Sequence, residues 1–94
     1  MQNKDLSGIF VAKVINNIDP LERERILVRA VGLHDLENSN ENYGVWAEHG
    51  IGSNFIYGNF PKINSMVYIM FIKDINNEYD FNKCLYFGVV RNNI

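Results

Sequence analysis

The chain has 94 residues, a length that corresponds to one domain burying roughly 60–65% of the surface of its unfolded state. Its composition, 47% hydrophobic, 21% charged and 13% aromatic, excludes disordered, collagen-like and disulfide-stapled proteins. The net charge of −2 disfavours a protein that binds nucleic acid through phosphates, because such binding needs an excess of Lys and Arg. We therefore expect a single domain over residues 1–94.

The sequence predicts neither a membrane anchor nor classical secretion. No window approaches the roughly 20 consecutive apolar residues that a membrane-spanning helix requires. Residues 1–6 are polar and carry no apolar signal core. The single cysteine, Cys84, permits no internal disulfide, so folding in a cytoplasm is the simplest interpretation.

Apolar residues alternate with a period of two along most of the chain, and helical periodicity is scarce, which predicts an all-β protein. The predicted strands cover residues 8–17, 25–32, 45–48, 65–73 and 84–91.

The first strand ends before Pro20, which fixes its own φ and favours an extended Asp19. The second strand, 25–32, has one apolar face and one face that mixes Arg with apolar residues, so we expect one buried side. A long exposed loop over 33–43 and a loop rich in glycine and aromatic residues over 50–62 flank the short third strand.

The fourth strand, 65–73, is apolar on both faces. One face carries Val67, Ile69 and Phe71. The other carries Met66, Tyr68, Met70 and Ile72. A turn is predicted at Asn76-Asn77, before the last strand.

Five short strands joined by unequal loops in one small domain favour a closed barrel. The oligonucleotide/oligosaccharide-binding (OB) barrel is a common way to arrange five strands, and closure removes exposed sheet edges. The expected fold is a small five-stranded OB-like barrel with long loops.

No set of residues predicts an enzyme, a metal site or a cofactor site. His34 and His49 do not stand at metal-ligand spacing with Cys84 or with a carboxylate cluster. Gly50–Ser53 lacks the lysine and the following helix of a phosphate-binding loop. Cys84 opens a strand, where a small buried side chain is the expected role.

Aromatic residues leave a nucleic-acid alternative open. The available side chains are Trp46, Phe55, Tyr57, Phe60, Tyr68 and Tyr86. Bases stack on such side chains in OB barrels, in a groove flanked by cations that follow the phosphates. Here the cations are scattered, and Arg23 and Arg25 alternate with glutamates, so packing is the favoured role. A single-stranded nucleic-acid-binding OB protein is the alternative function, and a carbohydrate-binding OB module is a third.

Three segments carry a resemblance to a known family: residues 10–34, 45–47 and 61–90. The first contains Asp19-Pro20-Leu21, Arg25, Val28-Arg29 and Gly32-Leu33-His34 at the spacing of the family pattern. Val45-Trp46 stands where the family has Pro-Trp. Pro61 to Phe71 follows the family's hairpin with Asn64-Ser65 in place of Gly-Asp, and Phe87-Gly88 replaces Leu-Gly.

Together these segments resemble the N-terminal OB domain of the central spike protein in contractile-tailed phage baseplates, which also occurs in the VgrG spikes of type VI secretion. The resemblance implies a structural protein of the virion tail baseplate, folded in the host cytoplasm. It assigns fold-keeping roles to one set of residues: Asp19, Pro20, Arg29, Gly32, Trp46, Pro61 and Gly88. Asp19 can accept hydrogen bonds from nearby amides, and Trp46 is large enough to plug one end of the barrel.

The resemblance also implies partners, namely tail hub and spike proteins, and trimers within the assembly. It places Met66, Tyr68, Met70 and Ile72 on the outside of the barrel. Large apolar side chains on an exterior face are typical of a docking surface. The alternative is that the loop over residues 50–60 folds over them. The lytic domain, β-helical needle and His-x-His iron-binding tip of larger family members have no counterpart in these 94 residues.

Overall fold

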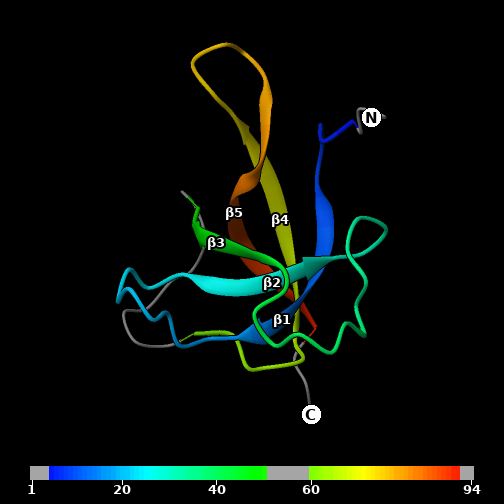
Figure 1. Ribbon diagram of the computed structural model, residues 1–94, viewed down its shortest axis with the longest axis vertical. Helices are drawn as coiled ribbons and strands as arrows, with labels where there is room; N and C mark the ends of the chain where they lie inside the picture. The colour runs from blue at the N-terminus through cyan, green and yellow to red at the C-terminus, as the bar shows by residue number, and fades with distance from the viewer. Residues whose placement is uncertain (1–4, 51–59, 92–94) are drawn as a thin grey trace.

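A computed structural model of the chain describes residues 5–50 and 60–91, and these residues form five strands (Figure 1). The strands are β1 (Phe10–Asn16), β2 (Ile26–Ala30), β3 (Val45–His49), β4 (Met66–Lys73) and β5 (Tyr79–Arg91). Each of them overlaps a strand predicted from the sequence. Within the described residues, no helix is long and apolar enough to cross a membrane.

The strands close into a barrel in the order β1-β2-β3-β5-β4. β1, β2 and β3 pair antiparallel in sequence, and β4 returns to pair antiparallel with β1. β5 then pairs antiparallel with β4 and parallel with β3, which closes the barrel. This arrangement confirms the predicted all-β fold with a small five-stranded OB-like barrel.

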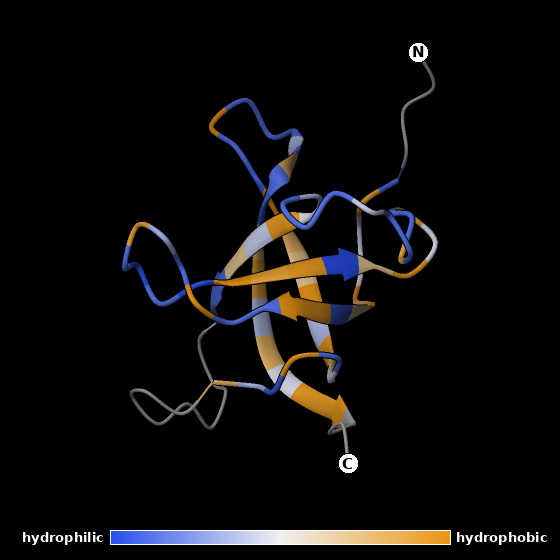
Figure 2. Cartoon of the chain, turned by 60° about the horizontal axis from the view of Figure 1, so that its bottom comes forward, coloured by the Kyte–Doolittle hydropathy of each residue, from blue (hydrophilic) through white to orange (hydrophobic). Residues whose placement is uncertain are grey.

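Residues from the inward faces of all five strands form the core. In Figure 2 the hydrophobic stretches lie mainly along the strands, and the loops are mostly hydrophilic. The buried core residues are Leu6, Ala12, Val14, Ile26, Val28, Ala30, Val45, Ala47, Val67, Ile69, Phe71, Cys84 and Tyr86. The period-two alternation therefore identified the inward face of β4 correctly, because Val67, Ile69 and Phe71 all lie inside.

The prediction that the second strand has only one buried side was wrong, because every residue of β2 is buried. Leu27 pairs with Trp46 of β3 on the outer face and is 1% exposed. Gly44 lies so close to β2 that a Cβ there would be 2.5 Å from the Val28 carbonyl oxygen. Arg29, which is 4% exposed, is covered by the loop between β2 and β3.

The predicted start of the last strand at residue 84 was also wrong, because β5 begins at Tyr79. The predicted turn at Asn76-Asn77 is confirmed: the Asn77 amide donates to the Asp74 carbonyl at 3.0 Å, and Asn77 has φ 62°. This turn makes β4 and β5 one long hairpin, whose tip projects beyond the barrel (Figure 1).

Candidate functional site

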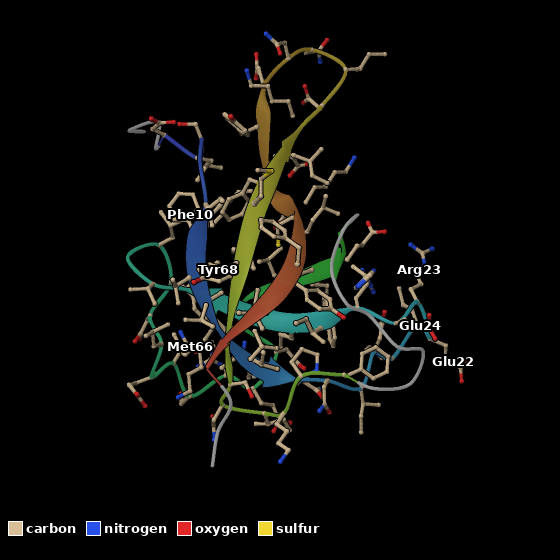
Figure 3. All side chains as sticks on the ribbon, turned by 180° about the vertical axis from the view of Figure 1, so that it is seen from behind. Phe10, Glu22, Arg23, Glu24, Met66 and Tyr68 are labelled. Atoms are coloured by element: carbon tan, nitrogen blue, oxygen red, sulfur yellow. The ribbon has the colours of Figure 1, made fainter. Side chains whose placement is uncertain are left out.

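The β4 outer face consists of the outward-pointing residues Met66, Tyr68, Met70 and Ile72. The burial of their neighbours places them on the barrel exterior, since Val67 and Ile69 are fully buried. Tyr68 and Met70 are each 40% exposed, whereas Met66 and Ile72 are half-buried. Figure 3 shows Met66 and Tyr68 along β4 as seen from behind the view of Figure 1.

Side chains on the two neighbouring strands extend this apolar surface. Val11 of β1 pairs with Tyr68, and Leu85 of β5 pairs with Met70. Paired residues project on the same side of a sheet, so these half-buried side chains lie next to the β4 outer face. Near Tyr68 the register shifts, because β4 has one residue and β5 has two between neighbouring pairs.

Gly88 lies in that irregularity with φ +152°, a conformation that disfavours other residues. A Cβ at this position would be 3.8 Å from Cδ2 of Tyr68, so the glycine borders the Tyr68 ring. Gly88, to which the resemblance assigns a fold-keeping role, therefore lies at the bend of β5 beside the β4 outer face.

The alternative in which the loop over residues 50–60 covers the β4 outer face concerns residues 51–59, which lie outside the described residues. The two ends of that loop are held to the barrel. The Gly50 amide donates to the Tyr86 carbonyl at 2.7 Å. Phe60 packs against the core, and the Pro61 carbonyl accepts a hydrogen bond from Asn17 Nδ2 at 3.1 Å.

Asp19 organises the loop between β1 and β2. Its Oδ1 accepts from the Leu21 amide at 2.9 Å, and its Oδ2 accepts from the amides of Arg23 and Arg25 at 3.1 and 3.3 Å. The Arg25 guanidinium also donates to both carboxylate oxygens, with Nε 2.7 Å from Oδ2 and Nη2 3.1 Å from Oδ1. These guanidinium hydrogen bonds hold the pKa of the Asp19 carboxyl well below its ordinary value. The carboxylate thus accepts five hydrogen bonds from the β1–β2 loop.

Trp46 lies on the outer side of the barrel and does not plug its end, contrary to the sequence-based expectation. Its neighbours Val45 and Ala47 belong to the core, so strand alternation turns Trp46 to the opposite face. There the Arg25 guanidinium carbon lies 5.4 Å from the ring centroid, close enough for a cation–π contact. Asp19, Arg25 and Trp46, three residues of the family pattern, therefore form one contact chain.

Arg29 holds the loop between β2 and β3 by donating to four backbone carbonyls. Nε donates to Tyr43, Nη1 to Leu36 and Asn38, and Nη2 to Asn40, all at 2.9–3.0 Å. A buried guanidinium with five donors suits this arrangement, because no other side chain presents so many in one plane. The sequence assigned Arg29 a fold-keeping role but did not reveal this contact set.

His34 belongs to the same loop and is hydrogen-bonded to the end of β2. Its Nδ1 accepts a hydrogen bond from the Ala30 amide at 2.8 Å, after the turn that Gly32 makes with φ +86°. The His34 ring stacks on Phe81 at 5.0 Å, and Phe81 stacks on Phe71 at 5.6 Å. The sequence analysis missed Phe81, although it alternates with polar residues as a strand residue should.

Cys84, one of the residues weighed for chemistry, is a buried free cysteine. Burial raises the pKa of the Cys84 thiol to about 12, which keeps it protonated and unreactive. Burial also raises the pKa of Tyr86, and nearby Glu24 adds to the shift. No three His, Cys, Asp or Glu residues in the described part of the chain lie close enough together to hold a metal ion.

The four aromatic residues within the described ranges that were considered for base stacking lie in different places. Tyr86 points into the core, Tyr68 lies on the β4 outer face, and Trp46 is in contact with Arg25. Phe60 packs against the core. The two others, Phe55 and Tyr57, lie outside the described residues.

The chain was compared with protein families, with curated proteins and with solved structures, and none of the three comparisons found a match.

Proposed function

We propose that the chain is a structural component of a contractile-tail baseplate hub or of a related injection machine. In this role the OB barrel is an adaptor between the tail tube or hub and the spike. The proposal combines the family resemblance of the Asp19 to His34 segment with the apolar exterior of the barrel. It includes trimers within the assembly, as in the family that the chain resembles.

The β4 outer face is the observation that carries the proposal. Tyr68 and Met70 remain 40% exposed on a barrel that has already buried its core, and Val11 and Leu85 continue the apolar surface on both sides. Docking a second protein would remove this area from water, at about 25 cal/mol for each Å² of apolar surface buried. Within the barrel every strand is paired on both sides, so outward-facing side chains such as these are available to contact another protein.

The placement of two cations favours this role over single-stranded nucleic-acid binding. OB barrels that bind oligonucleotides use the β2–β3 face and its adjoining loops. In this chain the Arg25 guanidinium on that side is bonded to Asp19, and the Arg29 guanidinium is bonded to four backbone carbonyls. Two of the five N–H donors of Arg25 and four of the five of Arg29 are thus engaged within the protein. Glutamates flank Arg23 at the tip of the β1–β2 loop (Figure 3).

Charging the β4 outer face tests the proposal directly. Met70→Glu should abolish co-purification with the hub assembly, because the carboxylate would be buried without a partner in the interface. The domain itself should melt at nearly the wild-type temperature, since Met70 is partly in water before docking. Ile18→Glu is the matched control, because Ile18 is 75% exposed on the β1–β2 loop. It should co-purify like the wild type.

Two results would contradict the proposal. Unchanged binding of Met70→Glu would place the docking face elsewhere on the barrel. Salt-sensitive binding of single-stranded DNA or RNA oligonucleotides at micromolar concentration or tighter, measured by fluorescence titration at low salt, would favour the nucleic-acid alternative.

A further inference from the structure

Ile75 stands at the tip of the β4–β5 hairpin with its side chain in water. It is 99% exposed, the highest exposed fraction among the large apolar residues of the described chain. The hairpin projects beyond the barrel in Figure 1, so its tip can reach a neighbouring molecule before the barrel wall does. Single exposed apolar residues are common on protein surfaces. Ile75 differs from them because it stands on a hydrogen-bonded turn and because its neighbours are acidic.

The turn that carries Ile75 is fixed by four hydrogen bonds. The Asp74 amide donates to the Glu78 carbonyl at 2.7 Å, and the Asn77 amide donates to the Asp74 carbonyl at 3.0 Å. Asp74 Oδ1 also accepts from the amides of Asn76 and Glu78 at 2.8 and 3.1 Å. Just below the turn, the Lys73 ammonium lies 5.1 Å from the centroid of the Tyr79 ring. A partner of Ile75 would therefore meet a backbone that is already ordered, which lowers the entropy cost of binding.

The charge around the tip indicates the chemistry of that partner. Asp74, Glu78 and Asp80 are acidic, and residues 74–80 contain no Lys or Arg. Lys73 directly precedes Asp74 in the sequence, and its ammonium lies over the Tyr79 ring. An acidic tip is repelled by anionic lipid and by nucleic-acid phosphates, and it is attracted to a protein surface that carries cations.

We propose that the hairpin tip inserts Ile75 into a small apolar pocket, bordered by Lys or Arg, on a different protein subunit of the same assembly. This inference rests on the proposed function and adds a second contact to it. Ile72 of the β4 outer face lies on the same hairpin, so one subunit can contact both the barrel wall and the tip. In such an interface Ile75 supplies the buried apolar contact and the acidic residues set the orientation.

Site-specific photo-crosslinking tests the inference in the assembled particle. A photoreactive amino acid replaces Ile75 in the full chain, particles are purified, and the residue that it labels is identified by mass spectrometry. We expect one cross-linked subunit other than this chain, labelled beside apolar residues that have Lys or Arg around them. No cross-link, or a cross-link to lipid, to nucleic acid or to a second copy of this chain, would overturn the inference.

Binding measurements with that purified subunit complete the test. Ile75→Ser should weaken binding about ten- to a hundredfold, as expected when a buried isoleucine loses its apolar contacts. Glu78→Lys should weaken it at low salt, with a smaller difference at high salt. Ile75→Leu is the matched control and should bind within a few fold of the wild type. Equal affinity of Ile75→Ser and the wild type would contradict the proposed insertion.

The two proposals can fail separately. If the wild-type chain is absent from purified particles, the proposed function fails. Suppose instead that the wild-type chain is present, that Met70→Glu is lost from the particles, and that Ile75→Ser is retained with unchanged affinity. The docking role of the β4 outer face is then supported, and the hairpin inference fails.

Discussion

The Asp19–Arg25 pair should make one of the largest side-chain contributions to the stability of this domain, and Asp19→Asn measures it. The asparagine keeps the shape of the side chain but has only one acceptor oxygen. With that oxygen at the Oδ2 position, the amide nitrogen faces two donors, the Leu21 amide and Arg25 Nη2. The Arg25 guanidinium then loses its counter-charge. Water can replace little of that interaction, because the Asp19 side chain is only 2% exposed.

The expected cost follows from these contacts. A hydrogen bond to a charged group contributes about 1.5–3 kcal/mol, and removing one member of a buried ion pair costs about 3–5 kcal/mol. Because Arg25 is partly exposed, we expect a loss of about 3 kcal/mol. A domain of this size has a total stability of about 5–14 kcal/mol. The melting temperature should fall by about 12–24 °C.

Denaturant unfolding at several pH values provides the assay. The pKa of Asp19 is lowered in the folded state, so its contribution is fully present above the ordinary carboxyl pKa of about 3.9. The contribution is lost as the pH falls through the lower, folded pKa. The stability difference between wild type and Asp19→Asn should therefore be constant from about pH 5 to 8 and should shrink below about pH 4.

Asp35→Asn is the control, because Asp35 lies in an exposed turn where its carboxylate accepts from the Glu37 amide. It should cost well under 1 kcal/mol, the range expected for most surface substitutions. The reasoning is refuted if Asp19→Asn also costs less than about 1 kcal/mol, since the pair would then be worth no more than an exposed salt bridge. A difference that does not depend on pH would refute the assignment to the ionised carboxylate.

Two further substitutions test the loops. Arg29→Lys should destabilise the domain by about 3 kcal/mol, because an ammonium cannot donate to four carbonyls at once as the guanidinium does. Amide hydrogen exchange should then become faster over residues 36–43. Unchanged exchange would contradict the role given to Arg29. Glu22→Gly should stabilise the domain by about 0.5–1 kcal/mol in thermal melting, because Glu22 has φ 56°. Glu37→Gly, at a residue without a positive φ, should give no gain.

The strand pattern could be predicted from the sequence because burial on the two faces of a strand alternates with every residue. Val67, Ile69 and Phe71 lie inside the barrel as their spacing predicts. The early start of β5 was missed because Asp74 to Lys83 has the polar composition of a loop. A signal was present, since Tyr79 and Phe81 alternate with Asp80 and Asn82, and the structure uses it to extend the hairpin.

The burial of β2 on both sides could not be predicted from local pattern. An arginine in a strand indicates an exposed face, and Arg29 is buried because distant carbonyls of the β2–β3 loop surround its guanidinium. The outward position of Trp46 was missed for a related reason. Its size suggested a core role, whereas the alternation of Val45 and Ala47 decides the side on which it lies.

The family-like residues and the candidate binding residues occupy different parts of the molecule. Asp19 and Arg25 hydrogen-bond to each other, and Asp19 also accepts from backbone amides of the β1–β2 loop. Arg29 donates to backbone carbonyls of the β2–β3 loop, so these residues hold the two loops in shape. Among the described residues, the side chains of the β4 outer face and of Ile75 make no such hydrogen bonds to a loop. Tyr68 and Met70 keep 40% of their surface in water, and Ile75 keeps 99%.

Because the binding residues lie apart from the loop framework, the two sets can change independently among related chains. Substitutions on the β4 outer face or at the hairpin tip leave the loop framework intact, so partner specificity can vary while the barrel stays folded. A change at Asp19 or Arg29 affects the fold first and binding only through it. Loss of partner binding with an unchanged melting temperature therefore identifies the binding residues, and loss of both together identifies the framework.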